Sequence, residues 1–255
     1  MMALTLFSLL SLALAQAVRE ASSIWRRSTG ESTARLALRR CQNRLTSDLN
    51  SASFAASATG PGAVQLPSGG RNGDAVWCLS AIDPASGLYM RKANGNPFYQ
   101  ANVLYYLAVP TQHDQLYGQS CAGFRDAAGY DQGCPHKVLI RKVIDFGSAT
   151  VPSDESTEEA LMTQASLVGY LTHPASLNVS SMMSEPGVRQ VQLASTSLLC
   201  LRATRSGVTG TRTFDLDASS LSLLDAQRHL AVGSSDLSDT AYTNRSVFAV
   251  STGMP

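Results

Sequence analysis

Cysteine and histidine are the residues of this chain with the most reactive side chains, and their spacing decides what chemistry they can support. The five cysteines include no CxxC pair, so the spacing of a structural zinc site is absent. A nucleophile would have to be Cys134, with His136 or His113 as its base. A Cys-Pro-His segment supplies no separate residue to orient that base, so we expect no catalytic site there.

The sequence also lacks the fingerprints of the common enzyme classes. It contains no GxSxG, HExxH, GxGxxG or P-loop segment. A net charge of +1 gives no pronounced basic excess for neutralising phosphates, which argues against nucleic-acid binding. We therefore expect a non-enzymatic protein with no cofactor, no nucleic-acid partner and no identifiable small-molecule substrate.

Residues 122–133 form a polar, glycine-rich loop between Cys121 and Cys134. In an oxidising compartment these two cysteines are candidates for a disulfide, which would contribute about 3 kcal/mol by loop closure. The carboxylates Asp126 and Asp131 make calcium in the 124–133 loop the one cofactor to consider. Two carboxylates fall short of a calcium site, and turn capping explains both residues better.

An apolar segment occupies residues 1–22, and we predict that it forms a membrane or assembly helix. Spanning a bilayer takes about 20 apolar residues, so the run over 2–18, with its interspersed Ser and Thr, resembles a span that lacks its beginning. We expect the reading frame to continue upstream of Met1. The residues assigned to this helix are Met2, Leu4, Leu6, Phe7, Leu9, Leu10, Leu12, Leu14, Val18 and Trp25, the last as a candidate interfacial anchor.

A second interpretation of the same segment is a secretory signal peptide. Ala15-Gln16-Ala17 has the small residues of a cleavage site, but no lysine or arginine precedes Arg19, whereas a signal peptide begins with a basic region. Cleavage after Ala17 would release a soluble secreted binding domain. The mature N-terminus therefore distinguishes a retained helix from a released domain.

Residues 23–58 predict an amphipathic helix that continues the apolar one. Its apolar positions recur at steps of three and four, which predicts a single face for packing on a sheet. Gly30, within a cluster of Ser and Thr, predicts a kink between the two halves. The residues of the packing face are Ala34, Leu38, Cys41, Leu45 and Leu49.

Residues 59–255 predict a β-rich globular domain. Short β-branched or aromatic runs bounded by Gly, Pro, Asn or Asp predict strands. These runs are 75–82, 87–91, 103–109, 138–144, 191–193, 198–204, 211–216 and 246–251. Two further helices are predicted at 156–171, with a capping box at Ser156 to Glu159, and at 221–231. The expected fold class is α+β, with the long helix packed on an antiparallel sheet.

Several segments resemble type IV pilin-like proteins. The likeness is to the J-type minor pseudopilins of type II secretion and to the prepilin-type cassette proteins of planctomycete and verrucomicrobial genomes. It is continuous over roughly the first 55 residues and patchy beyond them. The segments that carry it are 23–28 (SIWRRS), 34–40 (ARLALRR), 45–52 (LTSDLNSA), 103–107 (VLYYL) and 138–142 (VLIRK).

This resemblance implies a structural subunit that polymerises with other pilin-like subunits through its apolar helix. It also implies anchoring in the inner membrane before assembly, with the β-domain facing the periplasm or the cell surface. The sequence departs from the family in one respect. A prepilin carries a basic leader ending in Gly, then Phe-Thr-Leu and an early glutamate, and these are not in this sequence.

Overall fold

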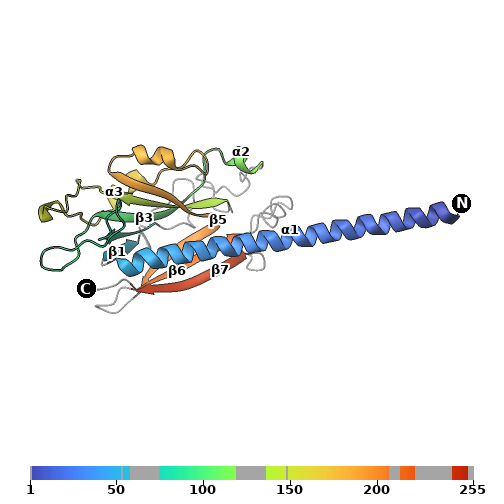
Figure 1. Ribbon diagram of the computed structural model, residues 1–255, viewed down its shortest axis with the longest axis horizontal. Helices are drawn as coiled ribbons and strands as arrows, with labels where there is room; N and C mark the ends of the chain where they lie inside the picture. Colours follow the sequence, from blue (N-terminus) through green and yellow to red (C-terminus); the bar gives the residue numbers. More distant parts are fainter. Residues whose placement is uncertain are drawn as a thin grey trace.

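A computed structural model of the chain describes residues 2–52, 54–57, 75–118, 136–147, 149–206, 213–221 and 243–251. Its dominant element is one α-helix of 50 residues, α1 (Met2–Ser51). At 1.5 Å per residue such a helix is about 75 Å long. Figure 1 shows that its C-terminal part lies along the sheet, whereas its N-terminal part projects from the domain as a single rod.

The helix passes through Gly30 without interruption, so the predicted kink is wrong. Two threonines of the Ser and Thr cluster around this glycine bond to backbone carbonyls within the helix. The Thr29 hydroxyl donates to the Trp25 carbonyl, and the Thr33 hydroxyl donates to the Thr29 carbonyl, both at 2.9 Å. Such bonds to the preceding turn are compatible with a continuous helix.

The globular domain is built on a seven-stranded antiparallel sheet whose strands follow the order of the sequence. Each strand pairs with the next one along the chain, so no crossover is needed. The strands are β1 (Phe54–Ser57), β2 (Val76–Ser80), β3 (Ala101–Ala108), β4 (Lys137–Ile144), β5 (Val188–Ser206), β6 (Thr213–Leu221) and β7 (Thr243–Ser251). The predicted α+β class, with a long helix on an antiparallel sheet, is confirmed.

Three of the predicted boundaries are wrong. The helix expected to reach residue 58 ends at Ser51, and Phe54–Ser57 form the edge strand β1. The run 87–91 makes only isolated bridges, Ile82 with Tyr89 and Arg91 with Pro97. The runs 191–193 and 198–204 belong to the single strand β5.

Strand β5 changes partners along its length, which explains why its sequence resembles two strands. Its first part pairs with β4 and its second part pairs with β6. Between them the register shifts, and Ser197 adopts a φ of 57°, a conformation that is uncommon outside glycine. The buried Ser195 hydroxyl donates to the Ala37 carbonyl of α1 at 2.7 Å, so this polar interruption of the strand is paired with the helix.

Both faces of the central strands β3 and β4 are covered, because every residue of each strand is buried. Successive strand residues point to opposite faces. Tyr105 accordingly reaches Asp48 of α1, whereas the next residue, Tyr106, donates to the Thr172 carbonyl on the other face at 2.7 Å. The sheet therefore forms the middle layer between α1 and the connection from β4 to β5.

That connection contains only short helical turns, so the predicted helix over 156–171 is wrong. Its pieces are the 3₁₀ turn η2 (Glu155–Thr157), the helix α3 (Gln164–Leu167) and the 3₁₀ turns η3 (Val168–Tyr170) and η4 (Ser180–Ser184). Asp154, not Ser156, caps the first turn, since its carboxylate accepts the Ser156 N–H at 3.0 Å. The helix predicted for 221–231 begins at the last residue of β6, and the rest of it lies outside the described residues.

Candidate functional site

The projecting half of α1 is the most unusual surface of the molecule. From Thr5 to Thr33, every residue whose side chain is described is exposed except Gly30, which is half-buried. Large apolar side chains in this stretch, including Phe7, Leu10 and Trp25, are 60–75% exposed. The side chains of Met2 and Leu4, assigned to the same surface from the sequence, lie outside the described residues.

This exposure has an energetic meaning. Apolar surface left in water forgoes about 25 cal/mol per Å² compared with burial, and monomeric proteins rarely expose contiguous apolar patches of more than a few hundred Å². The exposed side chains that form the surface are Leu6, Phe7, Leu9, Leu10, Leu12, Leu14, Val18, Ile24 and Trp25. We call them the projecting apolar surface. Among the described residues, no helix is both long and apolar enough to cross a membrane.

The other half of α1 is held firmly on the domain. Its apolar face, made by the five positions Ala34, Leu38, Cys41, Leu45 and Leu49, is at most 6% exposed and packs mainly across β5, β6 and β7. Burial raises the pKa of the Cys41 thiol to about 12, so this thiol stays protonated at neutral pH and packs as a small apolar group. Because this face is fixed on the sheet, the projecting half of α1 is held in a defined position relative to the domain.

A buried polar cluster reinforces the same junction. Tyr105 of β3 and Arg141 of β4 lie directly opposite each other in the sheet, and both reach Asp48 of α1. The Asp48 carboxylate accepts the Tyr105 hydroxyl at 2.5 Å and the Arg141 Nε at 2.6 Å. Arg141 also donates to Gln190 at 2.9 Å, and Arg44 donates to Gln192 at 2.8 Å. The helix is therefore pinned to three neighbouring strands.

Lys142, the next residue of β4, forms a matching pair on the opposite face. Its buried ammonium donates to Glu185 at 2.5 Å, and to the Thr172 hydroxyl and the Tyr170 carbonyl at 2.8 Å. Burial lowers the pKa of Lys142, and the Glu185 carboxylate opposes that shift. The Arg-Lys pair of β4 thus fastens both layers to the sheet. Sequence reasoning did not find these pairs, because their acidic partners lie far away in the chain.

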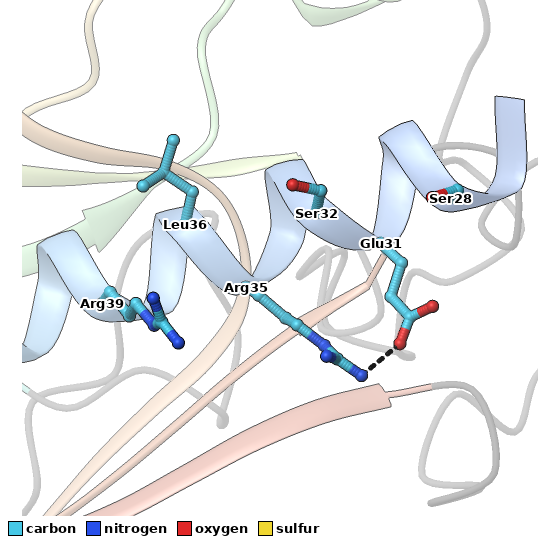
Figure 2. A pocket seen from close by; sticks show the side chains of 6 residues that line it. All are labelled: Ser28, Glu31, Ser32, Arg35, Leu36 and Arg39. Carbon is cyan, nitrogen blue, oxygen red and sulfur yellow. Dashed lines mark hydrogen bonds and ion pairs between the residues drawn. The ribbon is translucent and has the colours of Figure 1, made fainter. Parts of the chain in front are cut away.

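A shallow hollow marks the place where α1 leaves the sheet. Figure 2 shows that Glu31 and Arg35 point to one side of the helix, where they form an ion pair at 2.5 Å, and that Leu36 points elsewhere. Both charged side chains are largely exposed, so the pair is worth only about 0.3–0.5 kcal/mol. The residues that line the hollow are Ser28, Glu31, Ser32, Arg35, Leu36 and Arg39. All six of these side chains are exposed, and we assign the hollow no chemistry.

The two histidines considered as bases for Cys134 do come together. His113 Nε2 lies 2.8 Å from His136 Nδ1, and His113 Nδ1 lies 2.8 Å from the Asp114 carboxylate. Both imidazoles are buried, and the Tyr117 ring stacks on His136 with ring centroids 4.2 Å apart. Cys134 itself, and with it the predicted Cys121 to Cys134 disulfide and the 124–133 calcium loop, lies outside the described residues.

Comparison of the chain with family models, with curated proteins and with solved structures gives no match. Its function therefore has to be inferred from its own geometry. In the part of the chain that the structure describes, no group of three or more His, Cys, Asp or Glu residues is arranged to hold a metal ion. The projecting apolar surface, with the junction that holds it in place, is the strongest functional feature.

Proposed function

We propose that this protein is a non-enzymatic, pilin-like structural subunit, of the minor pseudopilin type, in a type IV pilus or a type II secretion-like assembly of the cell envelope. The observation that carries the proposal is the projecting half of α1, with large apolar side chains exposed over several turns. The other half of the same helix is fixed on the domain by buried apolar contacts and by the Asp48 cluster. One helix thus serves as both contact surface and stalk.

The contact is with the helices of other pilin-like subunits. A helix that is apolar around most of its circumference has to be buried on several sides, which a bundle of like helices provides. Before assembly, the same side chains are buried in the inner membrane, while the β-domain remains on the periplasmic or cell-surface side. Trp25 lies at the junction of these two environments and suits an interfacial position.

Deletion of residues 2–22 tests this function. We expect the shortened chain to be monomeric and soluble without detergent, whereas the full chain sediments as an oligomer or with membranes. The reason is that the deletion removes most of the projecting apolar surface and leaves untouched the buried face that starts at Ala34. Analytical ultracentrifugation of both chains, with and without detergent, provides the measurement.

A control for this experiment replaces Leu88, which is 65% exposed on the globular domain, with serine. This change should leave association unaltered, because it removes an exposed apolar side chain that is not part of the projecting apolar surface. Equal association of the full and shortened chains would contradict the proposed function. A mature protein that begins after Ala17 in the cell would instead support a secreted binding domain.

A further inference from the structure

A pair of buried acids joins the end of β4 to the strap formed by residues 155–162. Asp145 directly follows β4, and Glu159 lies beyond the turn η2; each is 4% exposed. Gly187 allows the close approach of β5 at this point, since it has a φ of +74° and an added Cβ would lie 2.3 Å from the Asp145 carbonyl oxygen. The Asp145 N–H donates to the Gly187 carbonyl at 2.8 Å.

Each acid uses only one of its two oxygens for the surrounding protein. Glu159 Oε1 accepts three N–H groups at 3.2 Å, from the Asn102 amide and from the backbone of Phe146 and Gly147. Asp145 Oδ2 accepts the Thr150 N–H at 2.8 Å and the Arg189 guanidinium at 2.9 Å. Asp145 Oδ1 and Glu159 Oε2 are also buried, and neither oxygen accepts a hydrogen bond from an N–H or O–H group of the described residues. The two carboxyl groups lie side by side, since Glu159 Oε1 accepts the N–H of Phe146, the residue that follows Asp145, and each acid shifts the pKa of the other.

A hydrogen bond between two carboxyl groups requires a proton, because two ionised carboxylates have only acceptors. A hard cation is a poorer occupant than a proton, since calcium takes six to eight oxygen ligands, whereas among the described residues this pair offers two unpartnered carboxylate oxygens. We propose that Glu159 carries a proton on Oε2 and donates it to Asp145 Oδ1, forming a proton-dependent latch between β4 and the strap. Loss of this proton to solvent turns the bond into a repulsion and opens the latch.

The neighbouring charges support this assignment of the proton. The Arg189 guanidinium of β5 lies 2.9 Å from the Asp145 carboxylate, so Asp145 is the member that stays ionised. Tyr170 of η3 is a further titratable group that interacts electrostatically with the pair. Its pKa is raised by burial and then by Glu159, Glu185 and Asp145. The adjacent Glu158 pairs with Lys92 instead.

The direction of the pH dependence follows from the opposite pKa shifts of the two acids. Burial, and then the contact with Asp145, raise the pKa of Glu159 to about 8, against about 4.3 in an unfolded chain. Burial alone would raise the pKa of Asp145, but hydrogen bonds from Glu159 and Arg189 outweigh it and lower that pKa. Between about pH 4.3 and 8 the folded chain therefore binds one proton more than the unfolded chain, and stability falls as pH rises through this window.

Opening the latch would detach the strap from the end of β4 and leave it held by β2 and β3 alone. Asn102 of β3 donates to the Ala160 carbonyl at 2.7 Å and accepts the Met162 N–H at 3.0 Å, and Trp77 of β2 donates to the Met162 carbonyl at 2.9 Å. These bonds hold residues 160 and 162 of the strap on β2 and β3. The latch holds residue 159 of the strap at the end of β4. The domain thus has a layer whose attachment responds to pH, independently of the assembly function proposed above.

Titration of the full chain in detergent, with ¹³C-labelled glutamate side chains observed by NMR, tests the proposal directly. We expect one glutamate carboxyl resonance, assigned by its absence from Glu159→Gln, to change its shift near pH 8. Titration of every glutamate below about pH 6 would overturn the latch, and this result needs no variant to be stable.

Thermal unfolding of three chains supplies the second readout. Glutamine at position 159 carries a permanent N–H donor for Asp145, so the unfolding midpoint of Glu159→Gln should fall less between pH 6 and 9 than that of the unaltered chain. The matched control is Glu158→Gln, which changes the neighbouring acid and should retain the full pH dependence. The same pH dependence in all three chains would overturn the proposal.

Discussion

Replacing Leu45 with alanine is expected to lower the free energy of unfolding by about 2–5 kcal/mol, the range for large-to-small changes at well-packed sites. Leu45 is 0% exposed and lies in the core that α1 shares with the sheet. The change leaves a cavity between helix and sheet that neighbouring side chains fill only in part. Urea unfolding of the chain lacking residues 2–22, followed by circular dichroism, measures the effect.

The control for Leu45→Ala is Arg40→Ala. Arg40 lies on the same helix but is exposed, so its replacement should change stability by less than about 0.5 kcal/mol. Arg44, which the sequence suggests is exposed, is unsuitable because it is half-buried and donates to Gln192. Equal, small effects of the two changes would show that α1 does not pack on the domain.

The second large effect is expected for Arg141→Met, which should destabilise the fold by about 3–5 kcal/mol. Arg141 and Asp48 are 9% and 10% exposed in their side chains and lie 2.6 Å apart. Removing the cation leaves the Asp48 carboxylate buried with the Tyr105 hydroxyl as its remaining strong donor. The loss of stability comes more from this unpaired buried carboxylate than from the net free energy that the ion pair contributes to folding.

A double-mutant cycle separates the pair from simple loss of packing. Asp48→Asn retains an acceptor for Tyr105 but leaves Arg141 without its counter-ion. Combining it with Arg141→Met removes both charges, so the double variant should lose less stability than the sum of the two single variants. Strict additivity in urea unfolding would mean that Asp48 and Arg141 do not interact.

The sequence predicts the elements whose pattern is local. The three- and four-residue steps from Ala34 to Leu49 identify the face of α1 that is buried, and the apolar runs 103–109 and 138–144 locate β3 and β4. The ends predicted for these two strands lie within about two residues of the observed ones. These features depend on periodicity and backbone preference, which neighbouring residues determine.

The features that the sequence does not predict depend on partners far along the chain. Arg141 lies 93 residues from Asp48, so nothing local indicates that this arginine is a buried anchor. The acids at 158 and 159 resemble the start of a helix, yet Glu158 accepts the Tyr99 N–H and Glu159 is buried beside Asp145. Tertiary pairing overrides the capping pattern in this segment.

Photo-cross-linking of the full chain in its native cell envelope tests the central claim most directly. A benzophenone amino acid replaces Leu10 on the projecting helix in one chain and Leu88 on the domain in another; these residues are 71% and 65% exposed. We predict that Leu10 gives adducts to the α1 helices of other subunits or to lipid, and that Leu88 gives neither. Subunit adducts from Leu88 alone, with Leu10 unreacted, would contradict assembly through the helix.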